Sequence, residues 1–415
     1  MQAQRLLPVC LILAACSPAQ SVATTPVAPP ATEFHGAVAG ICSKLDVARI
    51  GDRTFILYGD TGYQMTDWNP GETLAAAQSF VEVRGSQVVR NLSLLEGLPS
   101  NAGGFVSGDL SLGGRSLDEA WLLRTTSRYS KGGAGALFEH DLDPFTWNGR
   151  TWEPYPSSDY VQLPAKARSL PELPVDALCP RRDPKAPDLR FVRVTSTVHE
   201  ATGHLWVAGR CQSDSHVNYR PTRIVIAHGA PGSKEWEISD APASSQLDAI
   251  VNLSLFARSP NDLYLVAYEP FLPLERRVPY LAHFDGTNWR VQHPPMTTGI
   301  TSVSGSDDGT LWAAAGRDLW RQDADGTWKT IPLPPLPFVA RPRTESVRVS
   351  TVRAFGPDDV WVGVVFMARV KQGERNEAAE VRGAALYHSR PLETPLYCDA
   401  REPIETALVA VEESR

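Results

Sequence analysis

One short pattern recurs six times along this chain: an acidic or glycine-containing turn, then an apolar strand with an aromatic residue near its start. The clearest copies read GDRTFILYG, TGHLWVAGR, PNDLYLVAY, DGTLWAAAG and PDDVWVGVV. Short strands repeating with a period near ~50 residues are typical of a β-propeller, because a small sheet cannot bury its faces alone. The aromatic residues, called the anchors below, are 66, 85, 58, 48 and 49 residues apart and are Phe55, Trp121, Trp206, Tyr264, Trp312 and Trp361.

A second pattern follows most anchors: an apolar strand, a glycine turn and another aromatic residue. It reads FTWNGRTW, HGAPGSKEW, HFDGTNW and DADGTWK. An Asp-Gly or Asn-Gly pair between two strands favours the positive φ angles of a tight hairpin. Each unit is therefore predicted to be a four-stranded blade, with the inner strand before the anchor strand and the hairpin after it.

The chain is accordingly predicted to be all-β, a single β-propeller with six blades. The 85-residue step between Trp121 and Trp206 leaves a seventh blade as the alternative. Its excess, about residues 156–190, contains many prolines and little strand alternation. An insertion within the ring is therefore the favoured interpretation of that stretch.

Two segments, Asp308–Trp312 (DGTLW) and Asp285–Trp289 (DGTNW), resemble the propeller repeats of bacterial sensor and lipoprotein domains, including the two-component-regulator type. Those repeats carry a D-G-x-L-W core and a D-G-x-x-W hairpin. The resemblance covers about residues 40–395 and implies a propeller. It implies little about chemistry, because this scaffold serves hydrolases, lyases, receptors and assembly factors.

The first residues have the features of an export signal. A short basic region precedes the apolar stretch 6–14, which is too short to span a bilayer. The end of that stretch, Leu-Ala-Ala-Cys, resembles the lipobox of bacterial lipoproteins, which implies cleavage before Cys16 and its lipidation. We therefore expect a signal peptide over 1–15, a lipidated Cys16 with a Pro- and Ala-rich spacer over 16–34, and the propeller over 35–415. Ser17 in place of aspartate favours the outer membrane by analogy with enteric lipoproteins.

Four cysteines remain beyond the signal and the lipidation site: Cys42, Cys179, Cys211 and Cys398. None forms a C-x-x-C pair, and exported proteins meet an oxidising compartment, so disulfides are expected rather than metal ligands. Three connectivities are open. We favour Cys42 with Cys398, which would clasp the two ends of the ring, and Cys179 with Cys211. The apolar segment 406–411 is a candidate for a late closing strand.

A search for catalytic and metal motifs predicts no catalytic residue, no cofactor and no metal site. His199 and His204 are five residues apart, whereas a zinc-protease helix needs four, so a polar turn is expected there. The glycine-rich segment 131–135 lacks a strand–loop–helix context and is expected to link two strands. The Asp-Gly turns near Asp308 and Asp325 lack the further ligands of a calcium loop and are expected to be hairpin turns.

The function classes that remain are binding and propeller-type catalysis. The net charge of −7 argues against a nucleic-acid partner. Long loops on one rim are the usual binding face of a propeller. They carry Arg181-Arg182-Asp183, Glu275-Arg276-Arg277 and the charged segment 367–383. We expect a membrane-tethered, non-enzymatic binding or assembly module for a protein, peptide or glycan. The alternative is a glycan hydrolase or lyase with acids from several blade loops.

Overall fold

A computed structural model of the chain describes, with short gaps, residues 33–60, 78–93, 110–113, 121–154, 178, 189–213, 223–242, 252–335 and 347–397. This part of the chain is almost entirely β, as predicted, and contains five four-stranded antiparallel sheets and one five-stranded sheet. The first five sheets are numbered 1 to 5 in chain order. Each of them is formed by four strands consecutive in sequence.

The strand bounds of the first three sheets are as follows. Sheet 1 contains β2 (Cys42–Ile50), β3 (Arg53–Asp60), β4 (Gln78–Arg84) and β5 (Gln87–Ser93). Sheet 2 contains β6 (Leu110–Gly113), β7 (Trp121–Ser130), β8 (Leu137–Trp147) and β9 (Trp152–Pro154). Sheet 3 contains β10 (Leu189–His199), β11 (His204–Ser213), β12 (Arg223–Gly229) and β13 (Glu237–Asp240).

The remaining strands form three further groups. Sheet 4 contains β14 (Asn252–Ser259), β15 (Asp262–Tyr268), β16 (Tyr280–Phe284) and β17 (Trp289–Gln292). Sheet 5 contains β18 (Ile300–Gly305), β19 (Leu311–Ala315), β20 (Asp318–Gln322) and β21 (Trp328–Ile331). Sheet 6 combines β22 (Arg348–Gly356), β23 (Asp359–Gln372) and β24 (Glu377–His388) with β1 (His35–Gly40) and β25 (Leu396–Tyr397).

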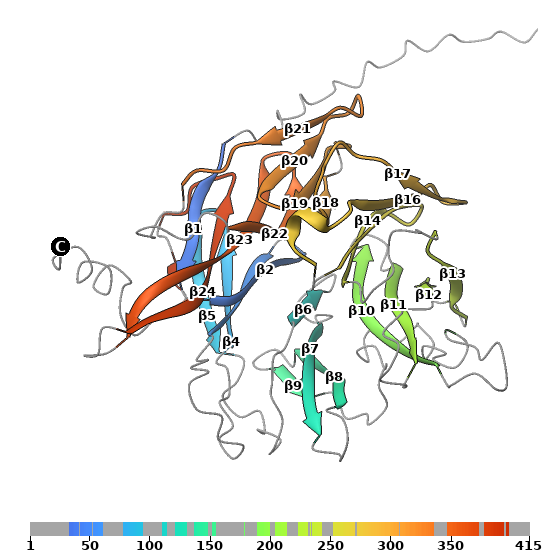
Figure 1. Cartoon of the computed structure of the whole chain (residues 1–415), viewed down its shortest axis with the longest axis horizontal. Coiled ribbons are helices and arrows are strands. Elements are labelled where there is room, and N and C mark those ends of the chain that lie inside the picture. The colour runs from blue at the N-terminus through green and yellow to red at the C-terminus, as the bar shows by residue number, and fades with distance from the viewer. Residues whose placement is uncertain are drawn as a thin grey trace, which may run out of the picture.

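The sheets follow one another around a ring, and their first strands lie nearest its centre (Figure 1). The first strands contact one another along this ring: β2 contacts β6 and β22, β10 contacts β14, and β18 contacts both β14 and β22. The last strands β13, β17 and β21 of sheets 3, 4 and 5 lie at the periphery. This is the arrangement of a β-propeller, in which each sheet buries its two faces against its neighbours.

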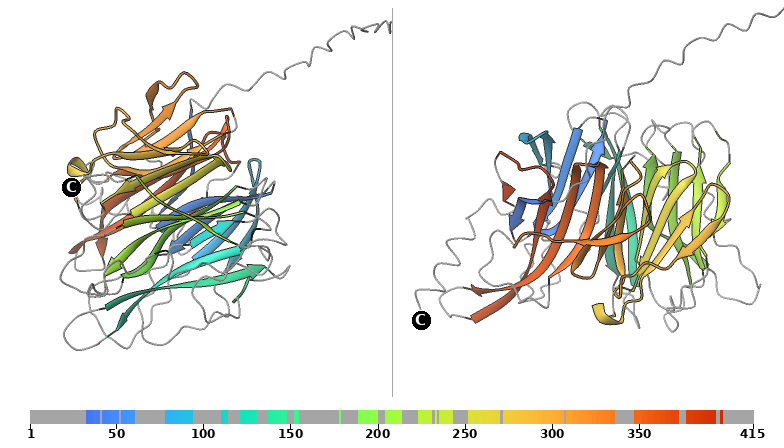
Figure 2. Two further views of the ribbon diagram at one scale, coloured as in Figure 1. Left: turned by 90° about the vertical axis from the view of Figure 1, so that its right-hand side faces the viewer. Right: turned by 90° about the horizontal axis from the view of Figure 1, so that it is seen from above.

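Strands from the two ends of the chain close the ring. β1 pairs antiparallel with β24, with His35 opposite His388, and β25 adds to β1 in parallel through Val38 and Leu396. The closing strand at the C-terminal end is thus β25. The predicted candidate, 406–411, lies outside the described residues. Figure 2 shows the strands of neighbouring sheets side by side, with the long β23–β24 hairpin reaching beyond them.

Glycine turns connect the strands as the hairpin patterns predicted. Gly286 has φ 90° and Gly326 has φ 84°, a region that residues with a Cβ rarely adopt. Asp285 Oδ1 accepts hydrogen bonds from the backbone N–H groups of Thr287 and Asn288 at 3.1 and 2.8 Å. The Asp-Gly pairs are therefore hairpin turns in this structure, as expected from their sequence.

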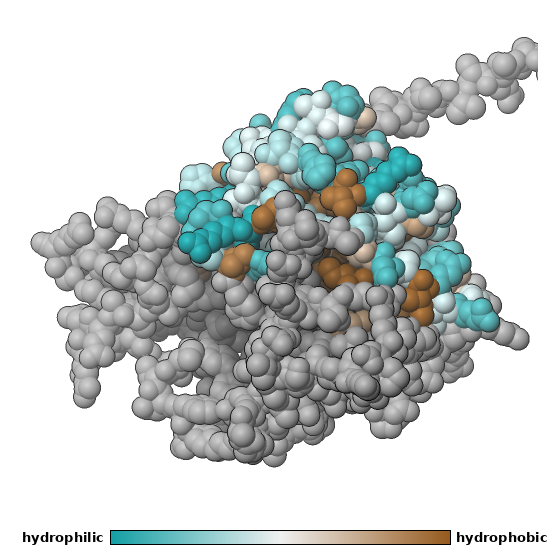
Figure 3. Space-filling view, turned by 45° about the vertical axis from the view of Figure 1, so that its right-hand side comes forward, coloured by the Kyte–Doolittle hydropathy of each residue, from teal (hydrophilic) through white to brown (hydrophobic). Residues whose placement is uncertain are grey.

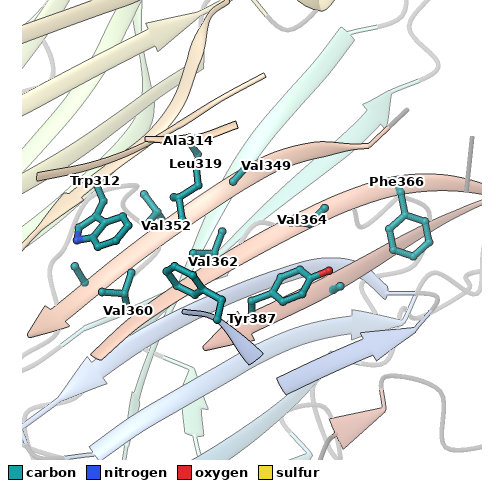
Figure 4. Packing of buried hydrophobic residues seen from close by; sticks show 13 residues of the cluster. Trp312, Ala314, Leu319, Val349, Val352, Val360, Val362, Val364, Phe366 and Tyr387 are labelled. Atoms are coloured by element: carbon teal, nitrogen blue, oxygen red, sulfur yellow. The ribbon is translucent and has the colours of Figure 1, made fainter. Parts of the chain in front are cut away.

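The core lies between the sheets. Between sheets 5 and 6, Trp312 and Leu319 of sheet 5 pack with Val352, Val362 and other apolar residues of sheet 6 (Figure 4). The anchors lie in the second strand of each sheet. Those whose side chains are described are buried: Phe55, Trp206, Tyr264, Trp312 and Trp361. Close packing of this kind makes each sheet dependent on its neighbours for stability.

Buried hydroxyl groups join the inner strands β18 and β22. Ser304 Oγ accepts a hydrogen bond from the Ala354 N–H at 2.9 Å, and Ser302 Oγ accepts one from the Val352 N–H at 3.2 Å. Thr301 Oγ1 donates to the Val349 carbonyl at 3.1 Å. The small polar residues of ITSVSGS therefore satisfy backbone groups of the next sheet near the ring centre, where an unpaired group would be costly.

Candidate functional sites on the two rims of the ring

The two rims of the ring differ in construction. Because consecutive strands are antiparallel, the turns between first and second strands and between third and fourth strands share one rim, called the turn rim below. Connections between second and third strands share the other, called the loop rim. The anchors lie near the turn rim, since they stand within the first residues of the second strands.

At the turn rim, a polar residue of the third strand stands directly opposite each anchor. Strand pairing aligns Trp206 with His228, Tyr264 with His283, and Trp361 with His388. Sheet 5 aligns Trp312 with Arg321, sheet 1 aligns Phe55 with Glu82, and sheet 2 aligns Trp121 with Thr146. Each sheet thus repeats one position that combines an aromatic ring with a polar partner.

In sheet 4 this position is part of an ionic cluster. The His283 ring stacks on Tyr264 with centroids 4.5 Å apart, and its Nε2 lies 2.8 Å from Asp262 Oδ1. Arg258 Nε donates to the other Asp262 oxygen at 2.5 Å, and its Nη1 donates to the carbonyl of Gly309 in sheet 5 at 3.0 Å. The cluster therefore links the strands of sheet 4 to one another and to the next sheet.

The equivalent cluster in sheet 6 spans the ring closure. His388 stacks on Trp361 with centroids 3.8 Å apart, and its Nε2 lies 3.0 Å from Asp359 Oδ1. Arg49 of sheet 1 reaches Asp359 and the carbonyl of Phe355. Burial by itself would raise the pKa of Asp359, but the His388 hydrogen bond and the charges of His388 and Arg49 lower that pKa below its ordinary value.

In sheets 5 and 1 the polar residue opposite the anchor also belongs to an ion pair. Arg321 lies over the Trp312 ring and donates to Asp323 at 2.8 Å. In sheet 1 the buried Glu82 is bridged at 2.7 Å by Arg84. Hydrogen bonds from Lys329 and Arg321 lower the pKa of Asp323. Both carboxylates also pair with the neighbouring strand, Asp323 with Lys329 at 2.6 Å and Glu82 with Arg53 at 3.6 Å.

Sheet 3 differs because its polar position faces a second histidine. His228 Nε2 lies 2.8 Å from Nδ1 of His204, and His228 Nδ1 lies 3.0 Å from Glu237 Oε2. The Glu237 side chain is 84% exposed, whereas His388 in sheet 6 is 2% exposed. This cluster is therefore open to solvent where the sheet 6 cluster is closed.

On the loop rim, the β15–β16 loop is held in place by Arg277. Its guanidinium lies 5.3 Å from the centre of the Tyr268 ring, and its Nε donates to the Leu272 carbonyl at 2.8 Å. Burial and then the nearby charge of Arg348 lower the pKa of Arg277. A Cβ at Gly299 would lie 2.8 Å from Cβ of Arg277, so the next connection packs directly against this side chain.

The loop that Arg277 anchors presents its other residues to solvent. It contains a 3-10 turn, η2 (Leu274–Arg276), in which Glu275 and Arg276 are exposed. Val278, two residues after Arg276, is an exposed large hydrophobic residue at 39%. The loop-rim candidate segment Glu275-Arg276-Arg277 therefore divides into two exposed charges and one buried anchor. The face drawn in Figure 3 shows hydrophobic residues in separate groups among hydrophilic ones over its described part.

Several predicted residues lie wholly or partly outside the described part of the chain. These are Cys16, the whole stretch 1–32, Cys179, Cys398, Arg181-Arg182-Asp183 and the side chains of Cys42 and Trp121. Of the segment 367–383 only strand pairing is described, which places most of it in the β23–β24 hairpin. The glycine-rich segment 131–135 stands between β7 and β8 in the sequence and lies outside the described residues.

The favoured disulfide pairs stay predictions. Cys42 begins β2 and Cys211 is fully buried in sheet 3. The Cys211 Sγ lies 3.5 Å from the carbonyl oxygen of Leu178, which is the neighbour of Cys179 in sequence. Cys179 itself lies outside the described residues, so its pairing with Cys211 is not tested by this contact.

Within the described residues, no group of three or more His, Cys, Asp and Glu side chains is arranged to hold a metal ion. The same part of the chain has no helix long and apolar enough to cross a bilayer.

Comparison with known proteins yields no match to a family profile or to a curated protein. Similar solved structures include a protein of unknown function from Dyadobacter fermentans, at 12% identity and a TM-score of 0.44, covering 88% of this chain and 97% of that one. A Trypanosoma rangeli sialidase in complex with sialic acid has 9% identity and a TM-score of 0.45, covering 86% and 54%. A Penicillium chrysogenum α-L-arabinanase complexed with arabinobiose has 11% identity and a TM-score of 0.43, covering 89% and 97%. Because these TM-scores are below 0.5, the fold rests on the strand order and ring closure described above.

Sequence reasoning missed the polar position opposite the anchors. The signal is present in the quoted hairpin patterns, since HGAPGSKEW and HFDGTNW both begin with the histidine in question. Those histidines precede the turn, whereas the glycine and the aromatic residue that define the pattern mark the turn itself. Their role depends on cross-strand pairing, which a linear pattern does not contain.

Proposed function

We propose that this protein is an exported lipoprotein with a six-bladed propeller that binds a protein, peptide or glycan through its loop rim and catalyses no reaction itself. Each of the six sheets contains one of the six anchors, which supports a count of six blades. The Leu-Ala-Ala-Cys sequence supports lipidation at Cys16, and Ser17 in place of aspartate supports attachment to the outer membrane. The spacer 16–34 would separate the lipid from the ring.

The observation that carries the binding proposal is the anchored β15–β16 loop. Arg277, 5% exposed, fixes the loop against Tyr268 and Leu272, while Glu275, Arg276 and Val278 point their exposed surface outward. A loop held in one conformation loses less entropy when it binds, so its charges and its apolar residue contribute more affinity. Exposed charged and apolar side chains on a fixed loop are better suited to binding a protein or peptide than to catalysing a reaction.

The direction of the tether agrees with this choice of face. β1 begins at His35, opposite His388, and therefore starts at the turn rim. The segment that would carry the lipid thus joins the ring on the turn rim. The loop rim lies at the other end of the strands, where a large partner has access to it.

The turn-rim carboxylates support a binding role over the alternative of a glycan hydrolase or lyase. Asp262, Asp323 and Asp359 each bond to an arginine, lysine or histidine within 3.0 Å. A glycosidase needs a pair of carboxyl groups facing a sugar across a cleft. These described carboxylates serve strand-to-strand and sheet-to-sheet links instead.

The test uses the mature chain with Cys16→Ser, which makes the purified protein independent of the lipid. A photo-crosslinking amino acid at position 276 should capture a specific envelope component, and the same group at Arg290, exposed on β17, should not. Arg276→Glu and Val278→Asp should each weaken the captured complex at least ~10-fold, with an unchanged circular dichroism spectrum. Crosslinking yields that neither substitution changes, or hydrolysis or cleavage of any member of a glycan panel by the purified chain, would overturn the proposal.

Lipidation is tested on the native chain in cells. The N-terminal peptide of the membrane-bound protein should carry a diacylglycerol on Cys16 by mass spectrometry. Cys16→Ser should leave the precursor unprocessed. An N-terminus at any other residue, free of lipid, would contradict the proposed tether.

A further inference from the structure

Two imidazoles of sheet 3 face each other edge to edge. His204 begins β11 and His228 lies in β12, and His204 Nδ1 is 2.8 Å from His228 Nε2. The ring centroids are 5.0 Å apart with an interplanar angle of 18°. Side-by-side rings in nearly one plane direct the N–H of one nitrogen along the lone pair of the other. This arrangement fits an N–H···N hydrogen bond between the two rings.

Neighbouring groups fix the orientation of His228. Its Nδ1 lies 3.0 Å from Glu237 Oε2, and its ring stacks on Trp206 with centroids 4.7 Å apart at 6°. A carboxylate accepting a hydrogen bond from Nδ1–H leaves the Nε2 lone pair available. A carboxylate on the far nitrogen of a metal-binding histidine is the usual support for that ligand, since it sets the tautomer and raises basicity.

We propose that His204 Nδ1 and His228 Nε2 bind a divalent transition-metal ion of the Zn²⁺, Ni²⁺ or Cu²⁺ class in place of their mutual hydrogen bond, with Glu237 orienting His228. Metal–nitrogen bonds of about 2.0–2.1 Å in a tetrahedral arrangement put the two nitrogens about 3.3 Å apart. Reaching that separation lengthens the present 2.8 Å contact by about 0.5 Å. Imidazole nitrogen suits these ions better than Mg²⁺ or Ca²⁺, which prefer oxygen.

Strand pairing places a third histidine at the adjacent register position, because His199 of β10 pairs with His204 of β11. The site is also accessible, since the side chain of His228 is 19% exposed and that of Glu237 is 84% exposed. The sequence-based expectation of no metal site considered spacing along the chain. His204 and His228 are 24 residues apart and are brought together only by the pairing of β11 with β12.

The chain contains its own matched control. His283 of sheet 4 occupies the same position opposite its anchor and stacks on Tyr264, but its Nε2 is taken by Asp262. Its imidazole is therefore paired with a carboxylate where His228 is paired with a second imidazole. A metal that binds histidines unspecifically would treat these two positions alike.

The experiment titrates the untagged mature chain, carrying Cys16→Ser, with Zn²⁺, Ni²⁺ and Cu²⁺ by calorimetry and by equilibrium dialysis with metal analysis. One ion per chain is expected, together with a rise in the melting temperature. His204→Gln and His228→Gln should each lower the affinity at least ~10-fold, Glu237→Gln should lower it about 10–100-fold, and His283→Gln should leave it unchanged.

Glu237→Gln alters a solvent-exposed side chain, so it keeps the test valid if a histidine variant fails to fold. The Co²⁺ form of the native chain should show the absorption bands of a nitrogen-ligated, low-coordinate ion, and these bands should be absent in His228→Gln. Lack of binding by the native chain, or equal losses in His228→Gln and His283→Gln, would overturn the proposal. Since the site lies on the turn rim, this result is independent of ligand capture by the loop rim.

Discussion

The guanidinium of Arg49 lies 3.5 Å from the carboxylate of Asp359, joining the first sheet to the last across 310 residues of sequence. The same Arg49 Nη1 donates to the Phe355 carbonyl at 3.3 Å. A further contact crosses this junction, where Glu393 accepts hydrogen bonds from Ser86 Oγ and Gln87 Nε2 at 3.0 and 3.1 Å. Side chains therefore supplement β1–β24 pairing in closing the ring.

Asp359→Asn is expected to lower the free energy of unfolding at neutral pH by about 1–3 kcal/mol, because it removes the charge that His388 and Arg49 surround. The pKa of Asp359 is lowered in the folded chain, so the unfolded chain binds the proton more readily. Its stabilisation is present above the unfolded pKa and is lost as the pH falls through the folded value. Denaturant titrations below about pH 4 should therefore show native stability falling more steeply than that of the variant.

The neighbouring Asp358 provides the control for that measurement. Its side chain is half-exposed and pairs with Arg390 at 2.7 Å. Asp358→Asn should cost less than about 1 kcal/mol, as expected of a surface ion pair. Equal losses from the two variants would show that the Asp359 cluster adds nothing beyond a surface pair.

Gly286→Ala should destabilise the protein more than Gly326→Ala, by about 1–3 kcal/mol. Both glycines have positive φ angles, 90° and 84°, so both substitutions carry a backbone cost. Only at Gly286 would the new Cβ also lie 2.8 Å from Cβ of Asn261, whereas nothing lies within 4 Å at Gly326. The difference between the denaturation midpoints of the two variants measures the packing of the Gly286 hairpin against the turn that contains Asn261. Equal midpoints would contradict this packing.

Ser304→Ala should cost about 1–3 kcal/mol, because it leaves the buried N–H of Ala354 without its partner in sheet 5. Chemical denaturation measures the loss, and hydrogen exchange should become faster at Ala354. Ser233→Ala, which removes a surface hydroxyl, should change stability by less than about 0.5 kcal/mol. Native exchange rates at Ala354 in Ser304→Ala would refute the assigned hydrogen bond.

Peptide mapping without reduction should recover Cys179 joined to Cys211 and Cys42 joined to Cys398. The first pair is favoured by the 3.5 Å contact between Cys211 Sγ and the Leu178 carbonyl. Loss of this crosslink in Cys211→Ser should lower stability by about 2–4 kcal/mol in the chain-entropy account. A peptide joining Cys42 to Cys179 would reject both pairs.

The predicted strands agree with the structure where residues close together in the sequence determine the local conformation. The Asp-Gly turn before Trp312 and the apolar residues that follow it predict a turn and a strand from local sequence alone. The turn at Asp285 and Gly286 is predicted in the same way. The interpretation of Glu275-Arg276-Arg277 as one charged surface was incomplete. Arg277 is buried because Tyr268 and Gly299 stand beside it in space, and neither neighbour is apparent from the segment itself.

By itself the sequence determined the repeated strands, the hairpin turns and the all-β class, because each depends on residues a few positions apart. Tertiary structure decided which described strands close the ring, namely β1 and β25 beside β24, whereas the predicted strand 406–411 lies outside the described residues. It also decided that His228 meets His204 while His283 meets Asp262. Those choices depend on the register between strands, where pairing brings residues far apart in the chain within bonding distance.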